Sequence, residues 1–127
     1  MKKEKKVFRL KDITAYQIGT KLSLIVWEEV KKWNILAKKT MGDQWIRSID
    51  SIAGNIAEGF GRYHKKDKNK FYYNARSSTY EAAHWTRLAY KRGLISENTN
   101  KKMINMLRIL PKEINILIKL TRENLEE

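Results

Sequence analysis

The sequence predicts an all-α fold, an antiparallel up-down four-helix bundle, from three observations. One proline and six glycines are spread over 127 residues, so few positions force regular structure to end. Apolar residues recur at intervals of three and four in long segments, which is the period of a helix face. The closely spaced turn signals that an all-β chain needs are missing.

A short turn is predicted between the first two helices. We expect the first helix from about Asp12 to Trp33, with Asp12 as its N-cap. Its apolar stripe comprises Ala15, Ile18, Leu22, Ile25, Val26, Val30 and Trp33. A turn over residues 34–41 then leads to the second helix, which we expect from Asp43 to Phe60. The buried face of the second helix comprises Trp45, Ile49, Ile52, Ile56 and Phe60.

The remaining two helices are expected from about Asp67 to Arg92 and from Ser96 to about Arg122, with Asp67 and Ser96 as N-caps. The buried positions of the third helix form a predicted seven-residue repeat of Phe71, Ala75, Ser78, Ala82, Trp85 and Ala89. Those of the fourth helix are Met103, Leu107, Leu110, Ile114 and Leu117. Pro111 lies inside the fourth helix, and we expect it to kink that helix.

Two helices also carry apolar residues away from their buried stripes. These residues are Met106, Ile109, Ile116 and Leu120 on the fourth helix and Leu24 and Trp27 on the first. A helix in a small bundle needs one apolar side, so a second side favours self-association, and we expect this set to form an oligomer interface. The alternative is that isolated apolar side chains on a surface are ordinary.

The composition and the two ends of the chain predict its organisation. We expect a basic N-terminal arm at residues 1–11, the helical bundle at 12–122 and a C-terminal tail at 123–127. No apolar segment of a signal peptide follows the arm, and no apolar run is long enough to span a membrane. Cysteine is absent, which excludes a disulfide framework. We therefore expect a cytoplasmic protein that does not enter a membrane.

The net charge of +13, from 27 basic and 14 acidic residues, favours a polyanionic partner such as RNA or DNA. The alternative is an ordinary lysine-rich surface. The densest basic segment with aromatic neighbours lies between the second and third helices, and it comprises Arg62, Tyr63, His64, Lys65, Lys66, Lys68 and Lys70. Cations there can contact phosphates, and Tyr63 and His64 can stack on bases. We interpret this segment, the basic corner, as the candidate nucleic-acid site.

A stripe of polar residues follows one side of the second helix. It comprises Arg47, Ser51, Asn55, Glu58 and Arg62, and the third helix offers Arg76, Ser78 and Glu81. If the two sides meet, pairs of the type Glu58–Arg76 and Arg47–Glu81 can form. A polar site is one interpretation. We favour the other, an interhelical network that fixes the register of the bundle.

The residues argue against an enzyme. A metal-dependent nuclease needs clustered carboxylates, whereas the polar stripe offers only Glu58 and Glu81, each matched by an arginine. His64 and His84 are the only histidines, too few for a zinc site without cysteine. Gly59 and Gly61 end a helix, so they do not cradle a phosphate at a helix start. We predict no catalytic residue, no metal and no cofactor.

Two segments carry a family resemblance. They are Gln44-x-x-Arg47-Ser48-x-Asp50-Ser51-Ile52-x-x-Asn55-Ile56-Ala57-Glu58-Gly59-Phe60-Gly61-Arg62 and Phe71-Tyr72-Tyr73-x-Ala75-Arg76-x-Ser78-x-Tyr80-Glu81-x-x-His84-Trp85. Together with Arg92-Gly93-Leu94-Ile95, they resemble the four-helix-bundle proteins encoded in 23S rRNA intervening sequences, over about residues 8–122. The order Ala53-Gly54 and the residue Ser77 depart from that pattern, which leaves any site at these positions open.

The resemblance implies an antiparallel four-helix bundle that assembles as a ring-shaped homopentamer, with no established activity. The family is also similar to the accessory variability protein of diversity-generating retroelements, a basic pentamer that binds nucleic acid and a reverse transcriptase. We therefore expect a non-enzymatic basic oligomer that binds RNA or DNA with little sequence specificity. The alternative is a scaffold for a protein partner, such as a reverse transcriptase or a ribosomal protein, that does not itself bind nucleic acid.

Overall fold

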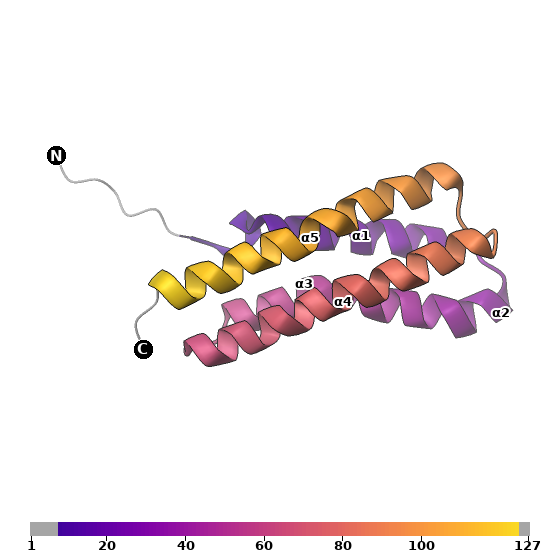
Figure 1. Cartoon of the computed structure of the whole chain (residues 1–127). Coiled ribbons are helices and arrows are strands. Elements are labelled where there is room, and N and C mark those ends of the chain that lie inside the picture. The colour runs from indigo at the N-terminus through magenta and orange to yellow at the C-terminus, as the bar shows by residue number, and fades with distance from the viewer. Residues whose placement is uncertain (1–7, 125–127) are drawn as a thin grey trace.

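A computed structural model describes residues 8–124, and every regular element in that range is helical. The four long helices are α1 (Thr14–Val30), α3 (Asp43–Phe60), α4 (Lys65–Lys91) and α5 (Glu97–Asn124). Figure 1 shows them side by side in one bundle, joined by short connections. The all-α prediction is therefore confirmed, and α3 has the predicted bounds.

The core lies between the four long helices, because α1 packs against α3 and α5, and α4 packs against the same two helices. Trp45, Ile49, Ile52 and Ile56 of α3 are fully buried, as their spacing predicts, whereas Phe60, predicted on the same face, is half-buried. On α5 the whole predicted stripe is buried, and the helix continues past Pro111. On α1 the predicted stripe is buried except at Ile18 and Ile25, which are half-buried.

The start of α1 differs from the prediction. Asp12 ends a short 3-10 turn, Leu10–Asp12, in which its carboxylate accepts a hydrogen bond from the backbone N–H of Arg9 at 3.1 Å. Ile13 takes the N-cap position of α1 in an extended conformation and is buried. The predicted N-cap is wrong because Asp12 closes the preceding turn. Residues 1–7, most of the predicted arm, lie outside the described residues.

Residues 35–42 are helical, which corrects the predicted turn. The side chain of Asn34 accepts a hydrogen bond from the backbone N–H of Ala37 at 2.9 Å and so starts α2 (Ile35–Ala37). A wider π-helical turn, η2 (Lys38–Gly42), follows and runs directly into α3. The wide turn lets Met41 enter the core.

Three of the six predicted core positions of α4 are correct, and the other three are displaced by one residue. Ala75, Ala82 and Ala89 are buried as predicted, but the other core positions belong to Tyr72, Thr79 and Thr86, while Phe71, Ser78 and Trp85 are half-buried. The threonines can be buried because each hydroxyl donates to a carbonyl of its own helix, at 2.6 Å from Thr79 and 2.7 Å from Thr86.

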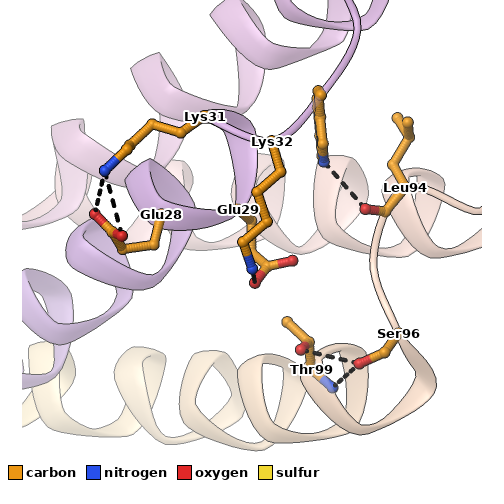
Figure 2. A network of polar contacts seen from close by, with 8 residues as sticks. Glu28, Glu29, Lys31, Lys32, Leu94, Ser96 and Thr99 are labelled. Atoms are coloured by element: carbon orange, nitrogen blue, oxygen red, sulfur yellow. Dashed lines mark hydrogen bonds and ion pairs between the residues drawn. The ribbon is translucent and has the colours of Figure 1, made fainter.

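The connection between α4 and α5 is tied to the end of α1. The indole N–H of Trp33 donates to the carbonyl of Leu94 at 3.0 Å. Gly93 has a φ of +73°, the left-handed conformation that ends α4 at low steric cost. Ser96 accepts from the backbone N–H of Thr99 at 3.1 Å, which confirms its predicted N-cap role. Figure 2 shows this capping bond together with the Lys31–Glu28 and Lys32–Glu29 pairs at the end of α1.

No helix within residues 8–124 is long and apolar enough to cross a membrane.

Candidate nucleic-acid interface

The basic corner lies where α3 ends and α4 begins, and Gly59 sets the distance between the two helices there. A Cβ atom on Gly59 would lie 2.8 Å from the ring of Tyr72 and 2.9 Å from the backbone oxygen of Lys68. Only a residue without a side chain permits this approach. α4 itself begins at Lys65 with His64 in the N-cap position, so the predicted N-cap at Asp67 is wrong.

Most side chains of the corner are open to solvent. Tyr63 is 83% exposed, and its ring meets the His64 ring edge-on at 4.9 Å between centroids. Arg62, Lys66 and Lys70 are also exposed, while Lys65 and Lys68 are half-buried. The corner therefore presents two aromatic rings beside several cations, the combination that binds bases and phosphates together.

Lys68 serves the fold. Its ammonium group donates to the carbonyl of Phe60 at 2.8 Å and to that of Gly59 at 3.4 Å, and it lies 5.6 Å from the centre of the Phe60 ring. These carbonyls belong to the last turn of α3, where the carbonyl of Gly59 also accepts from the backbone N–H of Arg62 at 3.1 Å. Desolvation lowers the pKa of Lys68. Its role as a phosphate ligand remains untested, but its ammonium is already engaged.

Arg62 is also partly engaged. Its guanidinium lies 3.7 Å from the carboxylate of Glu58 and stacks over the Phe71 ring at 4.7 Å. The pair is largely exposed, so it contributes little to stability and leaves donors of Arg62 available.

The lysines of the corner oppose the dipole of α4. Lys65, Lys66 and Lys68 belong to the first turns of that helix, where the unpaired N–H groups make the end electropositive. Asp67 is the acidic residue in the first turn. Cations at a helix start are unfavourable by a few tenths of a kcal/mol each, and a bound anion would remove that cost.

One pair of the predicted polar network joins α3 to α4. The hydroxyls of Ser51 and Ser78 lie 2.7 Å apart. Asn55 stays within its own helix, where its amide donates to the carbonyl of Ser51 at 2.7 Å. The network between these helices is thus smaller than predicted.

The predicted ion pairs between the helices do not form. Arg47 pairs with Asp43 at 3.0 Å on its own helix, and Glu58 pairs with Arg62. Glu81 accepts from the indole of Trp85 at 3.2 Å, and Arg76 donates to Asn115 of α5. For Arg47, Glu58 and Glu81, the bonded partner lies four residues away in the sequence, which is within easier reach than a neighbouring helix.

A second basic surface, which the sequence reasoning missed, lies between α4 and α5. The α4–α5 groove has a volume of about 630 Å³ and a rim of cations, Arg87, Arg108, Lys112 and Lys119. None of these four has an ion-pair partner among the described residues, and no carboxylate lines the groove. The helical spacing of Arg108, Lys112 and Lys119 is the signal in the sequence that could have found it.

The apolar residues assigned to an oligomer interface occupy separate surfaces. Leu24 and Trp27 are 68% and 57% exposed on α1, and Ile109, Ile116 and Leu120 of α5 are between 44% and 48% exposed. Met106 is half-buried and packs against the core. Trp27 lines a hollow beside the start of α3, whereas Ile116 lines the α4–α5 groove. Their role in self-association stays a prediction.

Within residues 8–124 no group of three or more histidine, aspartate or glutamate side chains could hold a metal ion.

These features define a basic helical bundle with two exposed cationic surfaces, one at the corner and one in the α4–α5 groove. The chain belongs to the 23S rRNA-intervening sequence protein family, whose profile matches residues 11–116. This confirms the family resemblance of the motifs on α3 and α4.

A solved structure supports the same fold. It is a protein of unknown function from the S23 ribosomal protein family of Bacteroides thetaiotaomicron, with 20% sequence identity and a TM-score of 0.74. The match covers 86% of this chain and 98% of the other. A comparison with curated proteins gives no significant match.

Proposed function

We propose that this protein is a non-enzymatic, oligomeric binder of RNA or DNA that contacts phosphates and has little sequence specificity. The observation that carries the proposal is the basic corner, where Tyr63 and His64 stand exposed beside Arg62, Lys66 and Lys70. Aromatic faces accept any base, and cations accept any phosphate, so this combination binds single strands without reading bases.

The overall charge supports the same function. A net charge of +13 is costly through self-repulsion, and a polyanion relieves it while releasing counterions from the nucleic acid. The ion pairs among the described residues each join side chains three or four positions apart in the sequence, so none of them links two of the long helices. Most exposed cations therefore remain available for a partner.

We propose binding without catalysis because the polar residues on α3 and α4 are engaged in contacts. Glu58 pairs with Arg62, and Glu81 accepts a hydrogen bond from Trp85. A magnesium-dependent nuclease needs carboxylates that converge on one point, and these two contact different partners. On this proposal the protein uses no metal or cofactor.

We further propose that the protein is an antiparallel up-down bundle that works as a cytoplasmic homopentamer. The exposed Leu24, Trp27, Ile109 and Leu120 support self-association, and a ring of five is what the family resemblance implies. Five copies of the corner would bind one strand by avidity, so weak contacts at each corner suffice. Light scattering of the intact protein tests the assembly, and a monomer would contradict it.

The test compares two charge-matched triple variants. Lys65, Lys66 and Lys70 are changed to glutamate at the corner, and in the control Lys21, Lys38 and Lys39 are changed to glutamate on exposed sites elsewhere. Lys68 is left unchanged because it caps α3. Anisotropy with a labelled single-stranded RNA and the matching DNA is measured across a salt series.

The corner variant should bind at least about tenfold more weakly. The slope of log affinity against log salt should fall by about 2 for each corner that contacts the strand, at one phosphate contact for each lysine. The control should keep the slope. Equal losses in both variants would assign binding to overall charge rather than to the corner. No measurable binding of the unmodified protein to RNA or DNA at low salt would refute the proposal.

A protein-binding scaffold is the second candidate function. A reverse transcriptase or a ribosomal protein are the kinds of partner that the family resemblance suggests. The apolar floor of the α4–α5 groove favours this candidate.

A further inference from the structure

The α4–α5 groove has an aliphatic floor. Ala83 of α4 and Ile104, Leu107, Pro111 and Ile116 of α5 line it, and its exposed surface is mainly apolar. Ile116 is 44% exposed there, although most apolar residues of α5 point into the core. An open apolar floor of this kind is the usual mark of an interaction surface.

The rim of the groove is cationic. Arg87, Arg108, Lys112 and Lys119 line it, and a neighbouring hollow of about 380 Å³ shares Arg87, Ile104 and Arg108 and adds Lys91 and Lys101. Lys101 pairs with Glu97, which lies in the first turn of α5. The other rim cations have no ion-pair partner in the described part of the chain. The floor and the rim therefore suit an occupant that is apolar in the middle and acidic at its edges.

The dimensions of the groove suit a helix. Its lining residues on α5 run from Ile104 to Lys119, which is about 22 Å along the axis at the rise of an α-helix. A helix that packs against two neighbouring helices lies in the groove between their side-chain ridges. The apolar residues on one face of that helix contact the groove. An occupant of about four turns would cover the whole floor.

Nucleic acid and a second copy fit this groove less well. Nucleic-acid interfaces are polar and wet, whereas this floor is aliphatic, and Tyr80 is the single aromatic residue in the lining. A second copy carries the same net charge of +13, so like-charge repulsion opposes its entry into this cationic groove, most strongly if it met the groove with its own. An acidic protein segment satisfies both the floor and the rim.

We propose that the α4–α5 groove binds an amphipathic helix of a protein partner, with aliphatic side chains on the floor and aspartate or glutamate along both edges. This inference goes beyond the proposed nucleic-acid binding and does not depend on it, because it concerns different residues.

The test uses the full chain and synthetic peptides of about 18 residues, long enough to span the groove. One peptide carries leucines at helical spacing with glutamates on both flanks. A second has the same composition in scrambled order, and a third is a polyglutamate of equal charge. Fluorescence anisotropy measures the binding of each. Calorimetry of the first peptide should show a negative heat-capacity change, which marks the burial of apolar surface.

We expect the amphipathic peptide to bind at least about tenfold more tightly than the scrambled peptide and the polyglutamate, because only it presents an apolar face to the floor. Raising the salt should weaken it only modestly, since apolar contacts are not screened. Ile116→Glu should abolish this preference, and the pair Arg108→Glu with Lys112→Glu should weaken the binding of all three acidic peptides. The control with Lys21, Lys38 and Lys39 changed to glutamate should keep the preference.

Three outcomes would overturn the inference. Equal binding of all three peptides would reduce the groove to a site for negative charge. If single-stranded RNA displaces the amphipathic peptide, and the groove variants no longer bind that RNA, the groove would be assigned to nucleic acid. A lower mass of Ile116→Glu in light scattering would assign it to self-association. Failure of the corner test alone leaves this inference standing, so the two proposals fail separately.

Discussion

Two glycines on α3 lie five residues apart, and replacing each with alanine should have opposite effects. Gly54 is exposed in the middle of the helix, and a Cβ atom there would meet nothing within 4 Å. Gly59 is buried one turn before the corner, where a Cβ atom would meet the Tyr72 ring at 2.8 Å and the backbone oxygen of Lys68 at 2.9 Å. Glycine-to-alanine substitution therefore adds a methyl group to open space at Gly54 and to a close contact between two helices at Gly59.

The magnitudes follow from these surroundings. In Gly54→Ala the helix gains the propensity of alanine without a clash, so stability should rise by about 0.5–1 kcal/mol. In Gly59→Ala the ring of Tyr72 can turn aside, but the backbone of α4 at Lys68 must move. Overpacking of this kind costs about 1–3 kcal/mol, and the propensity gained near the helix end offsets only part of it. We expect a net loss of about 1–2 kcal/mol.

Thermal unfolding followed by circular dichroism measures both effects. At about 4 °C per kcal/mol, Gly54→Ala should raise the Tm by about 2–4 °C, and Gly59→Ala should lower it by about 4–8 °C. All samples need the same protein concentration, because self-association would raise the Tm by mass action. If Gly59→Ala proves as stable as Gly54→Ala, then α3 and α4 do not require this close approach, and the account of the corner is wrong.

Three further substitutions test single contacts. Burial raises the pKa of Tyr72 to about 12. Because the pKa of Tyr72 is about 10 in the unfolded chain, the folded protein keeps its full stability below about pH 10 and loses stability as the pH rises toward about 12. The free energy of unfolding should therefore fall by about 1.4 kcal/mol on reaching pH 11. Tyr72→Phe should remove this part of the loss in urea titrations. Lys68→Met should lower the Tm by about 4 °C, from about 1 kcal/mol for the lost cap, whereas Lys66→Met should leave it unchanged. Thr86→Val leaves a buried tryptophan N–H without the acceptor it now has at 2.9 Å, so urea unfolding should show a loss of about 1–3 kcal/mol. Thr79→Val is the matched control, because its hydroxyl bonds only its own helix, and an equal loss there would refute the specific role of Thr86.

The sequence predicts the helices well where their ends have a steric cause. Gly93 ends α4 with a φ of +73°, whereas Gly61, which follows the last residue of α3, has a right-handed φ of −77° that other residues also adopt. The starts are less certain, because several side chains compete for the same cap. Asp12 closes a 3-10 turn and Asp67 lies inside the first turn of α4, although either residue alone is a good N-cap.

The face of α4 was harder to predict than its length. Phe71 and Trp85 are large and aromatic, so the sequence predicts them to be buried, but the structure buries Thr79 and Thr86 instead. A threonine loses little on burial when its hydroxyl donates within its own helix, and its methyl group then packs like that of valine. Thr86 also accepts a hydrogen bond from Trp45, a contact between distant segments that local patterning does not contain.

The candidate sites show the same division between local and distant information. The basic corner is continuous in the sequence, so composition alone predicts its place, but the capping role of Lys68 depends on where α3 ends. The α4–α5 groove combines residues 79–87 with residues 104–119, and only the fold brings them together. Its cations are inconspicuous in a chain that is rich in lysine throughout.

The positions of the ion pairs show which cations the fold needs, and both proposals depend on cations that it does not need. The ion pairs in the described residues lie in α1, α3 and α5 or just past the ends of α1 and α3, and each joins side chains three or four positions apart. Helix packing and hydrogen bonds such as Trp33 to Leu94 hold the bundle together without them. The cations of the groove and most of those at the corner are therefore unnecessary for folding. Their charge can be reversed with little loss of stability, so a loss of binding in such variants would report on the surface itself.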